Sequence, residues 1–228
     1  MALNIVEQID DAVRINRVLL SVADKTGLDE FVPALLEVNP EIVFYSTGGT
    51  WSKINDLLGP EKAAKNLVQV SDYTGQPEMQ GGLVKTLDFK IYLGLLSETY
   101  NEAHVEDMGR VEAQAIDMVV VNLYPFKETV AKEGVTPEEA RTNIDIGGPC
   151  MVRASAKNYL RVASVTDPSD YTALVEELKS SGGTLGLSTR LGLMKKSFAH
   201  TADYDAAIAG FFAGQDASAV SSVYNIQD

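Results

Sequence analysis

Short apolar runs alternate along the chain with segments whose apolar positions recur at helical spacing. Strand candidates cover residues 17–22, 41–45, 67–70, 91–96, 115–122 and 161–165, and Leu28, Phe31, Leu35 and Leu36 give the helical stripe after the first of them. This alternation is typical of βαβ units, in which parallel strands carry helices on their faces. The run at 115–122 is almost unbroken, as expected for a central strand buried on both faces. The pattern therefore predicts an α/β fold with a mostly parallel sheet.

Beyond residue 122 the pattern becomes mainly helical. Thr136, Pro137 and Glu139 are spaced as a capping box that starts a helix, and Asp167 before Pro168 starts another by similar logic. Residues 189–212 keep helical spacing with few breaks. The tail has little apolar content and is predicted to be peripheral. We expect one domain over residues 16–212, between an N-terminal extension (1–15) and a C-terminal tail (213–228).

Composition narrows the class of protein. The 228 residues contain 19 Lys and Arg against 32 Asp and Glu, a net charge of −13, which argues against a nucleic-acid partner because such binding depends on basic residues. A single Cys150 excludes an intramolecular disulfide, and the chain has neither a leader sequence nor an apolar run near 18 residues. We expect a cytoplasmic protein without a membrane partner. One Cys and two His are too few for a zinc cage, although carboxylates alone could hold a hard cation. We expect no metal.

Two strand ends carry groups suited to an anion. The first is Ser21 to Gly27, which includes Lys25 and Thr26, and the second is Ser46-Thr47-Gly48-Gly49-Thr50 before a likely helical segment at 51–58. Ligands of open parallel sheets bind beyond the carboxyl ends of the strands, and a glycine pair lets backbone N–H groups approach a phosphate at a helix N-terminus. A plain tight turn is the alternative. Neither a P-loop nor a GxGxxG pattern is present.

A second candidate region follows the central strand. Asn122 and Tyr124 come where that strand ends, and Asp145 lies between two isoleucines ahead of Gly147-Gly148-Pro149, with Pro149 predicted to open a helix. On this helix Arg153 and Lys157 share one face. The structural alternatives are a boundary tyrosine, a helix-capping acid and a solvated basic edge.

Eight motifs in one order carry a family resemblance. They are Ser21 to Gly27, Ser46 to Thr50, Val70 to Gly75 with Pro77-Glu78-Met79, Val84-Lys85-Thr86-Leu87, Asn122 to Phe126, Ile144 to Gly148, Arg153 to Asn158, and Phe198 to Ala202 with Tyr204-Asp205. Together they resemble the inosine monophosphate (IMP) cyclohydrolase domain of bifunctional formyltransferase/IMP cyclohydrolase proteins, over about residues 16–212. The resemblance implies a methylglyoxal-synthase-like fold, that is, a Rossmann-like three-layer arrangement with a helical C-terminal part.

The implied reaction closes the ring of 5-formamidoimidazole-4-carboxamide ribonucleotide, giving IMP and water in the last step of de novo purine biosynthesis. By resemblance, the catalytic residues are Lys85, Tyr124, Asp145 and Lys157. The substrate-binding residues are Ser21, Lys25, Thr26, Ser46, Thr47, Gly48, Gly49, Thr50, Thr86, Asn122, Ile146, Gly147 and Gly148. The ligand is a purine ribonucleotide, no cofactor is needed, and a homodimer is expected.

The sequence departs from the family in one segment. Leu83 stands where Arg is usual, Asp88-Phe89 where His-Pro is usual, and Tyr92 where His is common. Leu cannot replace the five donors and the charge of Arg, so these changes bear on the substrate contacts of the loop. Two other functions stay open, a nucleotide-sensing module without catalysis and a lyase of the methylglyoxal synthase type.

Overall fold

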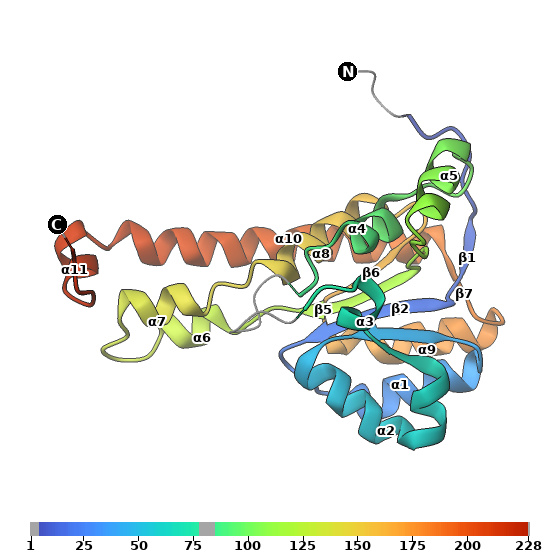
Figure 1. Cartoon of the computed structure of the whole chain (residues 1–228), viewed down its shortest axis with the longest axis horizontal. Coiled ribbons are helices and arrows are strands. Elements are labelled where there is room, and N and C mark those ends of the chain that lie inside the picture. Colours follow the sequence, from blue (N-terminus) through green and yellow to red (C-terminus); the bar gives the residue numbers. More distant parts are fainter. Residues whose placement is uncertain (1–4, 78–84, 228) are drawn as a thin grey trace.

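A parallel sheet of five strands forms the centre of the computed structural model, which describes residues 5–77 and 85–227 (Figure 1). The strands are β2 (Arg17–Val22), β3 (Val43–Ser46), β4 (Leu67–Gln69), β5 (Met118–Asn122) and β6 (Ala163–Val165). They lie in the order β4-β3-β2-β5-β6. Five of the predicted strand segments are thereby confirmed, with the predicted central run at β5.

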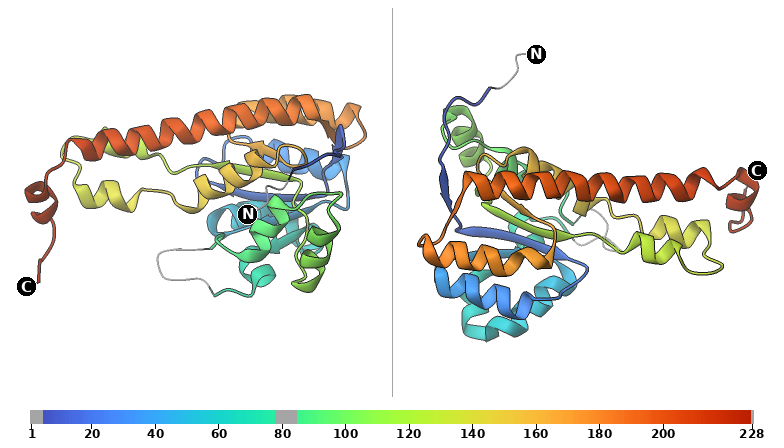
Figure 2. Two further views of the ribbon diagram at one scale, coloured as in Figure 1. Left: turned by 90° about the horizontal axis from the view of Figure 1, so that it is seen from above. Right: turned by 180° about the vertical axis from the view of Figure 1, so that it is seen from behind.

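Helices cover both faces of this sheet (Figures 1 and 2). On one face lie α1 (Leu28–Val38), α2 (Gly48–Asn66) and α9 (Tyr171–Ser180), and on the other lie α4 (Phe89–Leu96), α8 (Gly147–Lys157) and α10 (Leu187–Ala213). Alternate residues of β2 belong to two separate hydrophobic cores, one on each face of the sheet. Val18 and Leu20 pack on the face covered by α1, α2 and α9, whereas Leu19 packs on the opposite face. The predicted three-layer α/β class is confirmed.

The remaining helices are short. They are α3 (Val70–Thr74), α5 (Glu102–Arg110), α6 (Phe126–Val130), α7 (Pro137–Thr142), the 3₁₀ turn Pro168–Asp170 and α11 (Ala217–Ser221). The predicted capping box is present, because the Thr136 hydroxyl accepts the Glu139 N–H and the Glu139 carboxylate accepts the Thr136 N–H. Within the described residues, we find no helix of the length and apolarity needed to cross a membrane.

The predicted strand at 91–96 is wrong, because these residues form α4. Asp88 caps this helix by accepting the N–H of Lys90, and the buried Ile91 and Leu95 are four residues apart, on one helical face. Gly94 brings the helix against the backbone before β5, where a Cβ would lie only 2.4 Å from the Gln114 carbonyl oxygen. An apolar run this short does not distinguish a strand from a buried helix, so packing decided its conformation.

The N-terminal segment contributes a strand that the pattern did not indicate. Strand β1 (Ala12–Arg14) pairs antiparallel with β7 (Thr184–Gly186), with Val13 opposite Leu185. At the other end of the chain, α10 continues well past the sheet and carries α6, α7 and α11 beside its distal half (Figure 2). The Tyr224 hydroxyl joins the tail to Glu138 of α7. The domain limits at residues 16 and 212 stay predictions.

Candidate active site

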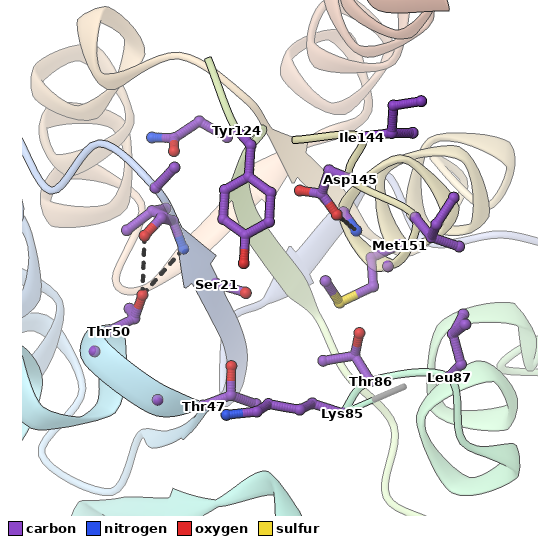
Figure 3. A pocket seen from close by; sticks show the side chains of 18 of the residues that line it. Ser21, Thr47, Thr50, Lys85, Thr86, Leu87, Tyr124, Ile144, Asp145 and Met151 are labelled. Atoms are coloured by element: carbon purple, nitrogen blue, oxygen red, sulfur yellow. Dashed lines mark hydrogen bonds between the residues drawn. The ribbon is translucent and has the colours of Figure 1, made fainter. Parts of the chain in front are cut away.

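A cavity of about 560 Å³ opens at the carboxyl edge of the sheet, beyond β2, β3 and β5 (Figure 3). The chain passes from β2 to β3 on one side and later returns to β5 on the other, so the cavity lies at the switch point of the parallel sheet. Its lining includes the predicted residues Ser21, Lys25, Thr47, Gly48, Gly49, Thr50, Lys85, Thr86, Asn122, Tyr124, Asp145, Ile146, Gly147 and Gly148. Residues more than 120 positions apart in the sequence thus meet at one site.

One end of the cavity is positively charged. The first turn of α2 begins with Gly48, whose φ of +49° favours glycine, and Gly49 follows it. A Cβ on Gly48 would lie 3.6 Å from Lys85 Nζ, and one on Gly49 would lie 3.8 Å from Lys25 Nζ. Two ammonium groups therefore converge on the N-terminus of a helix, where backbone N–H groups and the helix dipole also favour an anion.

The loop that carries Lys25 is held by two side chains. The Thr50 hydroxyl accepts the Val22 N–H and donates to the Val22 carbonyl, both at 3.1 Å (Figure 3). The Asn122 side chain accepts the Asp24 N–H at 2.9 Å and donates to the Asp24 carbonyl at 2.7 Å. Both side chains line the cavity, but these bonds direct their polar atoms at the loop rather than at a ligand.

The opposite end of the cavity holds Asp145. Its carboxylate accepts the Gly148 N–H at 2.8 Å, at the start of α8. Burial raises the pKa of the Asp145 carboxyl above its usual range, although N–H groups of Gly148 and Tyr124 oppose this rise. A Cβ on Gly148 would lie 2.5 Å from Asp145 Oδ2, so only glycine allows the acid this position. The site therefore contains an ionisable acid with increased affinity for a proton.

Tyr124 and Thr86 lie between the two ends. The Tyr124 side chain is 53% exposed and points into the cavity (Figure 3). The Thr86 hydroxyl lies close to the start of α8, since a Cβ on Gly147 would be 2.8 Å from it. A ligand that spans the cavity would thus contact cations at one end, hydroxyl groups in the middle and a carboxylate at the other.

Three predicted site residues are not brought to this cavity. Ser46 is fully buried and its hydroxyl donates to the Leu20 carbonyl, while the Thr26 hydroxyl donates to Asp24. Lys157 is the exposed last residue of α8, ten residues after Gly147, which at about 1.5 Å per residue amounts to about 15 Å along the helix. Pro149 does not open α8 as predicted, because the helix begins at Gly147.

Six lining residues were not among the predicted site residues. They are Val22, Ala23, Leu87, Thr142, Ile144 and Met151. Val22, Ala23, Leu87 and Ile144 belong to the motifs that carry the resemblance, whereas Thr142 and Met151 lie outside them. Met151 lies one helical turn beyond Gly147, so helical spacing could have indicated it.

The unusual residues 88, 89 and 92 do not line the cavity. Asp88 caps α4, and its carboxylate accepts a hydrogen bond from the Gln76 side-chain amide at 2.6 Å. Phe89 is 62% exposed. Tyr92 is partly buried against the core that contains Leu19. Leu83 lies outside the described residues. Neither histidine lines the cavity, and the described part of the chain contains no cluster of three or more Asp, Glu, His or Cys residues suited to a metal ion.

Comparisons with known proteins cover most of the chain. The family model "MGS-like domain" matches residues 27–150, and the model "AICARFT/IMPCHase bienzyme" matches residues 155–227. The "Bifunctional purine biosynthesis protein PurH" of Magnetococcus marinus is 46% identical over 203 residues, which is 89% of this chain and 37% of that protein. PurH of a Thermoanaerobacter species is 49% identical over 84% of this chain and 36% of its own length. The chain thus spans little more than a third of these relatives.

A solved structure matches most of the chain. It is described as the crystal structure of ForH, with a TM-score of 0.74 and 30% sequence identity. The match covers 90% of this chain and 98% of that one. The architecture described above, with its long C-terminal helix, is therefore shared with an experimentally determined protein.

Proposed function

Since the chain belongs to the MGS-like domain family, as the IMP cyclohydrolase region of PurH does, we propose that it is an IMP cyclohydrolase. The reaction joins the carboxamide nitrogen of the formamido ribonucleotide to the formyl carbon. The formyl carbon–oxygen bond then breaks, and the oxygen leaves as water with one proton from each of the two nitrogens. Because both reacting groups are on one molecule, the protein mainly has to hold them together and stabilise the oxyanion.

The positive end of the cavity suits the 5′-phosphate. Lys25, the first turn of α2 and the Thr47 hydroxyl supply a cation and donors at one point. Lys85 Nζ lies beside Gly48, so its position supports a contact with the phosphate at least as well as the catalytic role that the resemblance implies. These local cations also offset the repulsion between an anionic nucleotide and a chain of net charge −13.

The acidic end suits the base of the nucleotide. Asp145 would accept the proton of the attacking amide, and its raised pKa makes it a stronger base than an exposed carboxylate. Tyr124 would orient the amide or relay the proton. The Thr86 hydroxyl and the positive end of α8 lie close together in the lining and would stabilise the developing oxyanion. Lys157, which the resemblance implies is catalytic, would have to act from outside this cavity.

One observation carries the proposal: a single cavity is lined by Lys25, Lys85, Tyr124 and Asp145. The chain that forms this cavity is 46% identical to PurH of Magnetococcus marinus. A nucleotide sensor has no need of a half-buried acid opposite the phosphate end. A lyase of the methylglyoxal synthase type needs a histidine near the phosphate, and His104 and His200 are both outside the lining.

The test is an absorbance assay of the purified chain with the formamido ribonucleotide, without added folate or metal and with a chelator present. We expect IMP to form at the same rate with and without the chelator, because the reaction moves only protons and water. IMP binding without any turnover would contradict the proposal and favour the sensor.

A further inference from the structure

Tyr204 contacts the backbone of Asp145 from outside the cavity. Tyr204 belongs to α10 and is only 6% exposed, and its ring packs edge-on against Phe126 with centroids 6.2 Å apart. Its hydroxyl accepts the Asp145 N–H at 2.8 Å and donates to the Asn143 carbonyl at 3.3 Å. The two residues are 59 positions apart in the sequence, so only the packing of α10 makes this contact.

The segment that holds Asp145 is a short connection between two helices. Residues 143–146 connect α7 to α8 and belong to neither helix. The carboxylate is held by the N–H groups of Gly148 and Tyr124, whereas the peptide of Asp145 is held by Tyr204. The tyrosine hydroxyl both accepts and donates here, which a phenylalanine ring cannot do. The Tyr204 contact therefore fixes the backbone from which the carboxylate extends into the cavity.

We propose that Tyr204 is a positioning residue for Asp145, which aligns the acid with its substrate without touching the ligand. This inference rests on the proposed function. Errors of about 1 Å in the placement of a reacting group can lower a rate by up to about 100-fold, so a lost backbone anchor behind the acid should be visible in turnover. Binding of the nucleotide depends mainly on the phosphate end and should be almost unaffected.

Tyr73 provides a matched control. Its hydroxyl accepts a backbone N–H as well, that of Gln114 at 2.7 Å, and its ring is partly buried. Tyr73 does not line the cavity. Tyr73→Phe and Tyr204→Phe therefore remove the same kind of bond, one far from Asp145 and one directly behind it, and both should lower the urea midpoint of unfolding to a similar extent.

The experiment compares three proteins: the unaltered chain, Tyr204→Phe and Tyr73→Phe. We expect Tyr204→Phe to lower kcat by about 10-fold, with the Kd for IMP within about twofold of the unaltered value, and Tyr73→Phe to change neither. Amide hydrogen exchange of Asp145, followed by NMR, should be faster in Tyr204→Phe alone. Equal kcat in the two variants would overturn the inference.

A second outcome separates this inference from the proposed function. Absence of turnover in the unaltered chain would contradict the cyclohydrolase proposal, and the exchange measurement would then decide the role of Tyr204 without any activity. Asp145 exchange that is unchanged in Tyr204→Phe would show that the tyrosine does not anchor this segment.

Discussion

Asp145 and Lys157 are twelve residues apart in the sequence, and α8 separates them in space. Asp145 lies at the N-terminal end of this helix, in the cavity, and Lys157 is exposed at the C-terminal end. Two side chains at opposite ends of one helix cannot act on the same few atoms from within one chain. The resemblance and the geometry thus lead to different expectations for these two residues.

Asp145→Asn should lower kcat by a factor on the order of 10² or more, because the near-isosteric amide cannot accept a proton. Lys157→Ala should have a much smaller effect, measured in the same assay of IMP formation. A loss in Lys157→Ala as large as that in Asp145→Asn would contradict the single-chain site and indicate that another chain supplies Lys157.

The pH profile of kcat gives a second measurement on Asp145. Its pKa is raised from the ordinary value of 3.8, so the base becomes protonated, and kcat falls, at a higher pH than for an exposed aspartate. The acid limb of the profile should therefore lie above pH 3.8 and be absent from the residual activity of Asp145→Asn. An acid limb that persists in that variant would assign it to another group.

At the scale of elements, the loop between β2 and α1 depends on its neighbours for its shape. Thr50 of α2 holds Val22, and Asn122 at the end of β5 holds Asp24, each through both backbone groups. The register explains this, since Val22 lies opposite Asn122 in the parallel pair. The position of Lys25 thus follows from three adjacent strand ends.

Lys25→Ala should weaken IMP binding by about 10-fold or more, since a hydrogen bond to a charged group contributes about 1.5–3 kcal/mol. Asn122→Ala should weaken IMP binding less than Lys25→Ala does. In the double variant, Asn122→Ala should add little to the loss of binding, because it acts through the same loop as Lys25. Isothermal titration calorimetry of the two single variants and the double variant measures these losses.

Asn66→Ala is the matched control for Asn122→Ala. The Asn66 side chain also holds a loop, through the carbonyls of Pro40 and Ile42, but it lies outside the cavity. IMP binding should be unchanged in this variant. Fully additive losses in Lys25→Ala with Asn122→Ala would show that Asn122 contacts the ligand itself.

At the scale of the whole molecule, Arg190 connects segments from both ends of the chain. Its side chain is fully buried and donates to the backbone carbonyls of Asp10, Asp11, Tyr159, Leu160 and Leu185. These hydrogen bonds connect the residues before β1 with the turn after α8 and with β7. Burial lowers the pKa of the Arg190 guanidinium, so these carbonyls matter for keeping the charge in the interior.

Arg190→Lys should reduce the free energy of unfolding by about 3 kcal/mol, because one ammonium group cannot reach five carbonyls and leaves some of them unsatisfied. The urea midpoint of unfolding measures this loss. Arg110→Lys is the control, since the exposed pair of Arg110 with Asp107 contributes at most about 1 kcal/mol. Equal midpoints in the two variants would contradict this role.

The sequence alone determined the features that local chemistry encodes. The β2 and β5 runs and the capping box of α7 depend on residues a few positions apart, so periodicity and capping rules predict them. The resemblance added the family, and most of its implied residues lie around one cavity.

The tertiary structure decided everything that depends on distant partners. It made 91–96 a helix packed against the backbone before β5, directed the side chains of Thr50 and Asn122 to one loop, and placed Tyr204 behind Asp145. It also put Lys157 at the far end of α8. The physical reason is that side-chain hydrogen bonds and burial are set by which elements pack together, and the pattern along a chain carries little information about such long-range contacts.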